Sequence, residues 1–258
     1  MSTVIYASPI FGPIHSRRLG VSLGINLLPG DGKWCSFDCL YCECGLNADH
    51  RAHEPLPTAK DVEQKLVEKL LDMQAEGITP DVLTFAGNGE PTLHPDFPHI
   101  AERVRQVRDT LCPLARMSIL SNATQIHRPE IRQALSLFDN PILKLDTVNV
   151  AYIQHVDRPA GAYDVERQVK LLADFGGNVI IQTMFMTGDA DGRSVDNTSK
   201  EFVVPYLQAL QRIRPRQVMI YTIDRETPIP TLRKASPTTL DAIADRIRAL
   251  GLQVSVSY

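Results

Sequence analysis

The chain contains the stretch Trp34-Cys35-Ser36-Phe37-Asp38-Cys39-Leu40-Tyr41-Cys42-Glu43-Cys44, which holds four of its five cysteines. Three of them, Cys35, Cys39 and Cys42, follow a C-x3-C-x2-C spacing, with the aromatic Tyr41 directly before the last. Clustered cysteines in a reducing compartment usually bind metal or carry out redox chemistry. A cubane iron–sulfur cluster normally takes four thiolates, so three thiolates leave one iron without a protein ligand. The spacing therefore predicts a cluster with a position open to a substrate or cofactor.

Disulfides and zinc are the alternatives for these cysteines. The N-terminus lacks the basic and apolar segments of a signal peptide, so a reducing cytoplasm is the default expectation. Cys44 adds a further thiol, and His50 and His53 follow closely. Tetrahedral zinc sites usually draw on two separated ligand pairs, and the sequence has no second Cys-x2-Cys pair. We favour iron–sulfur, with zinc as the alternative.

Length and composition are typical of one globular α/β domain. The chain has 258 residues, 43% of them hydrophobic and 22% charged, which suits a single barrel-like domain over residues 1–258. The net charge of −3 provides no overall basic field for nucleic acid or anionic lipid. No apolar run approaches the ~20 residues that span a bilayer. We expect a cytoplasmic protein without membrane segments.

Short β-branched runs alternate with amphipathic helical stretches along the chain, as in parallel α/β proteins. The predicted strands are Leu19–Leu28, Asp81–Phe85, Arg116–Leu120, Ile142–Leu145, Asn178–Phe185, Gln217–Ile223 and Gln253–Ser257. The predicted helices are Thr58–Glu76, Pro95–Leu111, Pro129–Phe138, Tyr163–Phe175, Lys200–Ile213 and Pro237–Leu250. Active sites of such folds form where loops leave the carboxyl ends of the strands. The cysteine loop, residues 35–42, lies after the first strand, where this rule places a site.

The second predicted strand runs into Gly87-Asn88-Gly89-Glu90-Pro91. Two glycines with an asparagine between them indicate backbone that a ligand approaches closely. The alternative is a tight turn that ends the strand and steers the chain into the next helix.

Polar residues also follow the third, fourth and fifth strands. Ser121 and Asn122 end the third strand, where they either cap the next helix or bind a ligand. Lys144 and Asp146 share one face of the fourth strand, and both charges require a partner, either each other or a ligand. Gln182 and Met184 alternate in the same way on the fifth strand, and we assign Met184 to the core.

Together these motifs resemble the radical SAM (S-adenosylmethionine) superfamily. The resemblance rests on the cysteine spacing and on the Gly89-Glu90-Pro91 run, where Asn88 replaces the first glycine of the family motif. We attribute this replacement to the tolerance of Asn for left-handed backbone conformations. The resemblance implies a partial (β/α)6 TIM-like barrel, in agreement with the count of βα units, whose C-terminal part is residues 178–258.

The resemblance also implies the cofactors and the residues that hold them. Cys35, Cys39 and Cys42 would bind one [4Fe-4S] cluster, whose open iron chelates SAM. The reduced cluster would cleave SAM to methionine and a 5′-deoxyadenosyl radical, which abstracts hydrogen from a substrate. The residues implied in SAM binding are Tyr41, Gly87, Asn88, Gly89, Glu90, Ser121, Asn122, Lys144, Asp146 and Gln182. A flavodoxin or ferredoxin would supply electrons.

Four further segments are similar to Fe–S oxidoreductases related to the wybutosine-synthesis radical SAM enzyme, which acts on tRNA. They are residues 12–20, 24–27, 87–94 and 157–159. That enzyme has additional N-terminal cysteines, and this chain has none before Cys35. With the acidic balance, this favours a small or medium-sized substrate over tRNA. Wybutosine-like tRNA modification, a glycyl-radical activase acting on a partner protein, and a non-catalytic metal-binding module are the alternatives.

Three arginines lie beside the predicted strand ends: Arg17 and Arg18 before the first strand and Arg158 after the fourth. The planar guanidinium fork suits recognition of phosphate or carboxylate. Exposed, solvated arginines are the alternative. The hypothesis is a substrate that carries phosphate or carboxylate.

Overall fold

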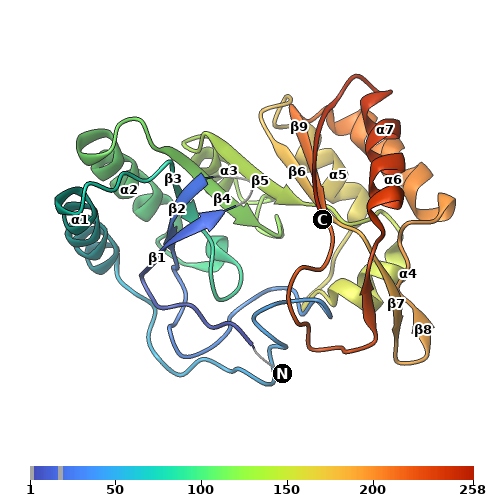
Figure 1. Cartoon of the computed structure of the whole chain (residues 1–258), viewed down its shortest axis with the longest axis horizontal. Helices are drawn as coiled ribbons and strands as arrows, with labels where there is room; N and C mark the ends of the chain where they lie inside the picture. The colour runs from blue at the N-terminus through green and yellow to red at the C-terminus, as the bar shows by residue number, and fades with distance from the viewer. Residues whose placement is uncertain (1–2, 17–19) are drawn as a thin grey trace. The chain divides into compact units, whose positions relative to one another are not determined.

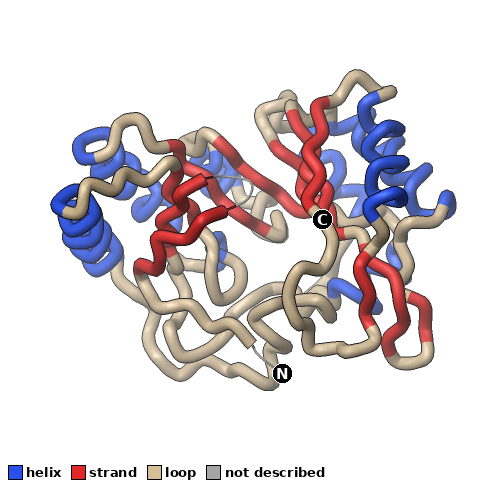
Figure 2. The backbone as a smooth tube through the Cα atoms, viewed as in Figure 1, coloured by secondary structure: helices blue, strands red, loops and turns tan. Residues whose placement is uncertain are grey.

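The structure is a computed structural model and describes residues 3–16 and 20–258. It is a mixed α/β fold with mostly parallel strands, as predicted (Figures 1 and 2). The chain divides into two compact units. The N-terminal unit comprises Ile5–Cys35 and Asn47–Pro141, and the C-terminal unit comprises Ser36–Leu46 and Ile142–Tyr258 together with residues 3–4. The prediction of a single domain over residues 1–258 stays a prediction.

The N-terminal unit is a sheet with helices packed on it. Strands β2 (Gly20–Ile25), β3 (Val82–Phe85) and β4 (Arg116–Ser121) are parallel, and β1 (Ile10–Ser16) pairs antiparallel with β2. The helices are α1 (Ala59–Ala75), α2 (Phe97–Leu111) and α3 (Pro129–Leu135), with a 3-10 turn, η1, over Pro91–Leu93. Phe85, Phe97 and Phe138 pack against one another in the core.

The C-terminal unit contains a parallel sheet and a smaller antiparallel one. The parallel strands are β5 (Asn140–Lys144), β6 (Ile180–Met184), β9 (Gln217–Tyr221) and β11 (Gln253–Ser257). The helices are α4 (Val150–Tyr152), the π-helical turn η2 (Ile153–Asp157), α5 (Val165–Ala173), α6 (Lys200–Ile213) and α7 (Pro237–Arg248). The small sheet joins β7 (Met186–Ala190), β8 (Arg193–Ser194) and β10 (Leu232–Lys234) in the order β10-β7-β8.

Every predicted strand and helix is present, with ends that differ by a few residues. The predicted start of α1 is confirmed in detail, because Thr58 and Asp61 form a reciprocal capping box. The sequence analysis missed β1 and the small sheet. Gly12-Pro13 inside β1 has the composition of a turn, and β8 has only two residues, too few for a periodic pattern.

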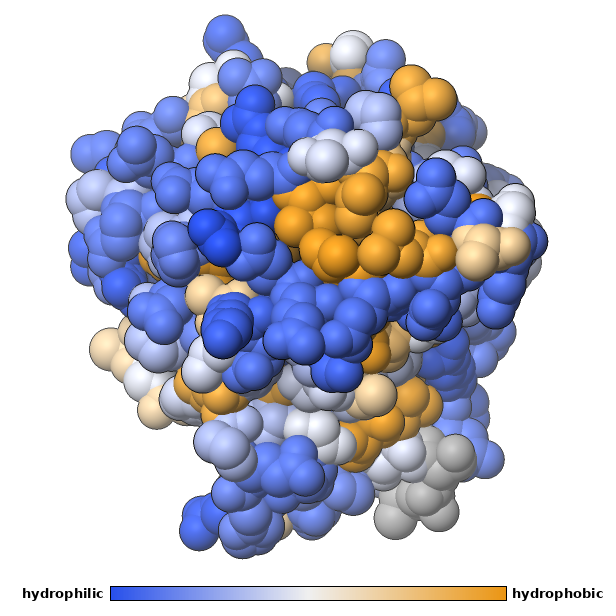
Figure 3. Space-filling view, turned by 90° about the vertical axis from the view of Figure 1, so that its left-hand side faces the viewer, coloured by the Kyte–Doolittle hydropathy of each residue, from blue (hydrophilic) through white to orange (hydrophobic). Residues whose placement is uncertain are grey.

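The face drawn in Figure 3 is mostly hydrophilic, with a large apolar patch and smaller apolar areas. Within the described residues, no helix combines the length and the apolar character required to cross a bilayer.

Candidate functional site

The residue before the first cysteine pairs with the glycine turn. In the N-terminal unit, Trp34 N donates to Asn88 O at 2.9 Å, and Glu90 N donates to Trp34 O at 3.1 Å. These two bonds form a parallel bridge between Trp34 and Gly89. Cys35 is therefore held in fixed register with Glu90, although the two residues are far apart in the sequence.

The two glycines of the turn admit other parts of the protein. Gly87 and Gly89 have φ angles of +143° and +133°. A Cβ atom on Gly87 would lie 2.5 Å from Asn26 Oδ1, and one on Gly89 would lie 1.9 Å from Trp34 O. Asn26 and Trp34 make these close approaches, which fits the tight turn that the sequence left as the alternative, and SAM binding at Gly87 and Gly89 stays a prediction.

Asn88 has a different role from the one that the sequence suggested. It is not among the residues with positive φ, so left-handed tolerance does not explain it. Its side chain is fully buried: Oδ1 accepts from Tyr6 N, while Nδ2 donates to Tyr6 O and Pro29 O, each at 2.8 Å. Asn88 therefore connects the N-terminal segment and the loop after β2 to the turn, and its assignment to SAM binding stays a prediction.

Glu90 joins the ends of β3 and β4. Its carboxylate accepts from Thr92 N at 3.0 Å, Thr92 Oγ1 at 2.5 Å, Ser121 Oγ at 2.8 Å and Asn122 N at 2.6 Å. The side chain is 1% exposed, and burial raises its pKa against these hydrogen bonds. All of these donors are neutral, and no ion pair involves Glu90 in the described part of the chain. Glu90 is thus a buried carboxylate whose hydrogen-bond partners among the described residues are all neutral.

Asn122 connects this carboxylate to the cysteine stretch. Its Oδ1 accepts from Thr124 N at 3.0 Å and Thr124 Oγ1 at 2.8 Å, which orients the amide. Its Nδ2 then donates to Cys35 Sγ at 3.5 Å. Hydrogen bonds to cluster sulfurs tune reduction potential, so Asn122 would act on the Cys35 sulfur if Cys35 binds a cluster as predicted.

The C-terminal unit contains a second polar cluster, built around Lys144. Lys144 Nζ contacts Asp146 Oδ2 and the Tyr41 hydroxyl and lies 2.9 Å from Asp157 Oδ1. Tyr41 also donates to Asp146, and Asp146 Oδ1 accepts from Met184 N at 2.9 Å. The structure therefore pairs Lys144 with Asp146, one of the two possibilities left open by the sequence.

Burial sets the protonation of this Lys144 cluster. Burial acting alone would lower the pKa of Lys144, but Asp146 and Asp157 raise it well above its usual value. Burial raises the pKa of Asp157 to about 7, although Lys144 opposes the shift. The sequence analysis noted Asp157 only as part of a similar segment. No local pattern pairs it with a lysine thirteen residues earlier.

The other predicted residues divide between core, surface and undescribed positions. Met184 is a core residue, as predicted, and Gln182 is half-buried on β6. Arg17 and Arg18 lie outside the described residues. Arg158 pairs with Asp191 at 2.9 Å, so the described arginine of the substrate hypothesis already has an acidic partner.

The five cysteines differ in exposure. Cys35, Cys39 and Cys42 are partly exposed, whereas Cys44 and Cys112 are buried. Among the described residues, no three His, Cys, Asp or Glu side chains converge as ligands of a single metal ion. The cysteine ligand set therefore stays a prediction.

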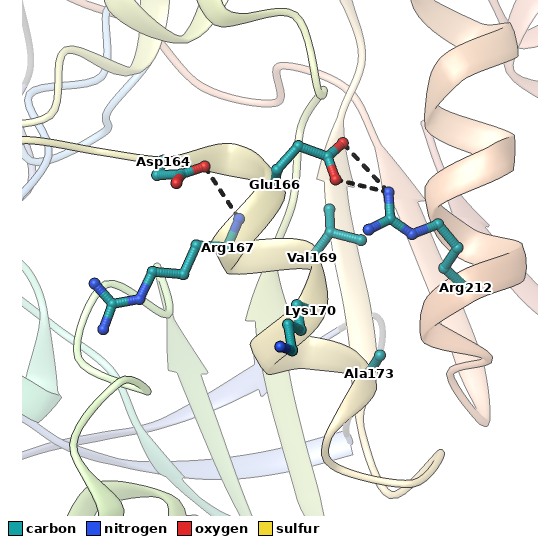
Figure 4. A pocket seen from close by; sticks show the side chains of 7 residues that line it. All are labelled: Asp164, Glu166, Arg167, Val169, Lys170, Ala173 and Arg212. Atoms are coloured by element: carbon teal, nitrogen blue, oxygen red, sulfur yellow. Dashed lines mark hydrogen bonds and ion pairs between the residues drawn. The ribbon is translucent and has the colours of Figure 1, made fainter.

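One open hollow of about 560 Å³ lies on α5 and α6 (Figure 4). Its lining residues are Asp164, Glu166, Arg167, Val169, Lys170, Ala173 and Arg212. Glu166 and Arg212 pair across it at 2.9 Å, and Asp164 accepts from Arg167 N at 3.1 Å. It contains no cysteine and no polar residue from a strand end, so it is separate from the candidate site residues.

The N-terminal unit fits the cofactors implied by the motifs. A buried carboxylate with only neutral donors matches a ligand that carries an ammonium group. Cys35 is partly exposed and receives an amide hydrogen, as suits a thiolate ligand. Glu90, Asn122 and Cys35 would hold these groups from one connected network.

Comparison with known proteins gives a family match and a fold match. The family model described as the radical SAM superfamily matches residues 31–196. A UPF0026 protein of Helicobacter pylori is 30% identical over 84% of this chain and 66% of its own length. The chain spans between 30% and 77% of the length of the curated relatives that it matches.

Two solved structures share the fold. A radical SAM methyltransferase from Sphaerobacter thermophilus superposes with a TM-score of 0.69 at 15% identity, covering 92% of this chain and 66% of the enzyme. Streptococcus suis SuiB bound to S-adenosylmethionine gives 0.63 at 15% identity, covering 90% and 50%. These likenesses confirm the predicted fold class, an α/β fold of the open, partial-barrel type.

Proposed function

Because the chain belongs to the radical SAM superfamily, whose members use an iron–sulfur cluster and SAM, we propose that it is a radical SAM enzyme. In this proposal, one [4Fe-4S] cluster is held by Cys35, Cys39 and Cys42. The Glu90 carboxylate receives the ammonium group of SAM. Cys44 and Cys112 are not ligands.

The observation that carries the proposal is the connection between Glu90 and Cys35. The Trp34–Gly89 bridge sets the register of the two residues, and Asn122 touches both, with its backbone on Glu90 and its side chain on Cys35. A cation-receptive carboxylate and a cluster ligand thus belong to one rigid network. A cofactor that bridges a cluster and a carboxylate requires this arrangement.

Each part of the network has a stated task. When bound, the reduced cluster and SAM supply a 5′-deoxyadenosyl radical that abstracts hydrogen from the substrate. Glu90 binds and orients the SAM ammonium group through a charge-assisted contact. Ser121 and Thr92 hold the Glu90 carboxylate in place. Asn122 donates to the Cys35 sulfur, which favours the reduced, more negative cluster.

The substrate and the partners belong to the same proposal. We assign a small or medium-sized substrate, because the net charge of −3 gives no overall attraction to a polyanion. A flavodoxin or ferredoxin in the cytoplasm would deliver the electron. A tRNA substrate predicts affinity that falls steeply with salt. Micromolar tRNA binding with that salt dependence would replace the small-substrate assignment with the wybutosine-like one.

Anaerobic reconstitution tests the cluster assignment. The protein should take up about four irons and four sulfides per chain, the stoichiometry of the cubane. Alanine at Cys35, Cys39 or Cys42 should abolish uptake, whereas alanine at Cys44 or Cys112 should not. Stoichiometric zinc in anaerobically purified protein, without iron uptake, would refute the cluster. Formation of 5′-deoxyadenosine from SAM after reduction tests the enzymatic step.

A further inference from the structure

The cysteine stretch pairs with a second segment of the C-terminal unit. Leu40 N donates to Val156 O at 2.9 Å, and Asp38 N donates to Asp157 O at 3.0 Å and to Arg158 O at 3.1 Å. Ala160 N donates back to Ser36 O at 2.8 Å. Residues 36–40 and 156–160 therefore run antiparallel to each other. The Asp157-Arg158-Pro159 segment, noted in the sequence only for its similarity, lies within this pairing.

The backbone of the second segment is shaped for the pairing. The π-helical turn η2 ends at Asp157, and Arg158 then adopts a left-handed conformation with φ +49°. Pro159, which has no N–H group, forms an isolated antiparallel bridge with Phe37. Turns of this kind are rare and mark positions that the surrounding structure determines strongly.

Apolar packing also supports residues 36–41 of the cysteine stretch. Leu40 and Tyr41 belong to a buried cluster with Val156 of η2 and with Met186 and Leu232 of the small sheet. Cys39 packs against the edge of this cluster. The small antiparallel sheet, which the sequence did not predict, therefore forms part of the support for the cysteine stretch.

The Lys144 cluster joins the two segments through side chains. Tyr41 comes from the cysteine stretch and Asp157 from the second segment, and Lys144 contacts both from the end of β5. Asp146 and Asp157 are 4% and 2% exposed. A buried ion pair stays favourable only while both partners are present. Because Lys144 contacts both residues, a change in the position of Asp157 should also affect the position of Tyr41.

We propose that residues 156–160 and the Lys144 cluster form a clamp that shapes residues 36–41 before any cluster binds, which makes Lys144, Asp146 and Asp157 positioning residues for cluster capture. The clamp gives a role to the ion pairs at the end of β5. By pairing with one another, these charged groups hold the loop that carries Cys39 and Cys42. The role of the clamp in cluster capture rests on the proposed function. The preformed shape of residues 36–41 does not depend on it.

Hydrogen exchange of the cluster-free protein tests the shape directly. The amides of Asp38 and Leu40 should be protected in the wild type, because both donate to residues of the second segment. In Asp157→Asn and Tyr41→Phe, these amides should exchange about ten- to a hundredfold faster, the range for losing a hydrogen bond to a charged group. Glu166→Gln is the matched control. It removes a carboxylate from an exposed ion pair of the same unit and should leave both amides unchanged.

Iron release to a chelator tests the consequence for the cluster. Supporting residues around metal ligands typically change metal affinity about 10- to 100-fold. After reconstitution, Asp157→Asn and Lys144→Met should therefore lose iron about ten times faster than wild type and Glu166→Gln. The single tryptophan, Trp34, precedes Cys35 and provides a fluorescence signal for loss of the cluster.

The outcomes separate the clamp from the proposed function. A wild type that binds no cluster, yet shows protected amides that open in the variants, refutes the proposed function and keeps the preformed clamp. A wild type that binds the cluster, with folded variants that exchange and release iron at the wild-type rate, overturns the clamp. If Lys144→Met does not fold by circular dichroism, Asp157→Asn and Tyr41→Phe decide, since both retain the lysine and its Asp146 partner.

Discussion

Each unit contains a buried polar network, and the two networks differ in whether their carboxylates have a cationic partner. In the part of the chain that the structure describes, Glu90 of the N-terminal unit has only neutral donors, whereas Asp146 and Asp157 of the C-terminal unit share the cation of Lys144. Both arrangements sit where parallel strands end. The first leaves a negative charge without a cationic partner, and the second cancels charge within the protein. On this comparison, we expect a charged residue at a strand end to bind a ligand only where the protein leaves its charge uncompensated.

The largest expected effect is a loss of stability when the Lys144 cluster loses its cation. Lys144→Met leaves Asp146 and Asp157 buried without their shared cation, so the free energy of unfolding of the cluster-free protein should fall by about 3–5 kcal/mol. Urea denaturation measures it. Lys65→Met, which removes an exposed helical ion pair with Glu68, should cost less than about 0.5 kcal/mol. Equal stability of the two variants would contradict the structural role of Lys144.

The next effect concerns binding at Glu90. Glu90→Gln removes the uncompensated charge, so the loss of a charge-assisted hydrogen bond of about 1.5–3 kcal/mol should weaken SAM binding ten- to a hundredfold. Equilibrium dialysis against the cluster-loaded protein measures this, with cluster content unchanged. Glu63→Gln, which breaks the surface pair with Arg103, is the control. If Glu90→Gln bound SAM with wild-type affinity, the role of Glu90 would be structural, as a connection between the ends of β3 and β4.

A smaller effect is the pH dependence of the Lys144 cluster. The pKa of Asp157 is raised by burial from 3.8 to about 7 in the folded protein, so the folded state binds more protons than the unfolded state between these values. Its contribution to stability is present below about pH 4 and is lost as the pH rises through about 7, with a slope of at most about 1.4 kcal/mol per pH unit.

Urea midpoints measured from pH 4 to 8 test this sign. The wild type should lose stability relative to Asp157→Asn as the pH rises, because asparagine does not titrate. Parallel curves for the two proteins would show that Asp157 is ionised throughout this range, and that Lys144 compensates both carboxylates fully.

The smallest effect is expected at Arg158. Its ion pair with Asp191 is partly exposed, so Arg158→Gln should change the free energy of unfolding by about 0.2–1 kcal/mol. The backbone of Arg158 still accepts from Asp38 in this variant. A loss as large as that of Lys144→Met would extend the buried network to Arg158. Weakened substrate turnover without loss of stability would instead support the phosphate or carboxylate hypothesis.

Much of the fold follows from local pattern. Helical periodicity locates α1, with Val62, Leu66, Leu70 and Met73 buried as the spacing predicts, and apolar runs locate the parallel strands. The elements that escaped prediction are those without a periodic signal. They are β1 with its Gly-Pro pair, and the strands β7, β8 and β10 of the small sheet, of which β8 has only two residues.

The sequence singled out the residues of the candidate site, but it did not predict the contacts that they make. The resemblance to a family motif singled out Glu90, and the ends of the predicted strands singled out Ser121, Asn122, Lys144 and Asp146. Their partners could not be predicted, because each hydrogen bond joins distant segments: Tyr41 and Asp146 are 105 positions apart, and Asn88 and Tyr6 are 82. Sequence spacing carries no information on such pairs.

By itself, then, the sequence determined the cysteine spacing, the alternation of strands and helices, and the polar residues at the strand ends, since each depends on neighbours along the chain. The tertiary structure alone decided which charges cancel. Lys144 lies near Asp157 because η2 returns to the end of β5. Within residues 3–16 and 20–258, Glu90 has no cationic partner, because the groups that reach it from β4 and η1 are neutral. Burial makes this difference large, because desolvation penalises an unpaired charge far more than a paired one.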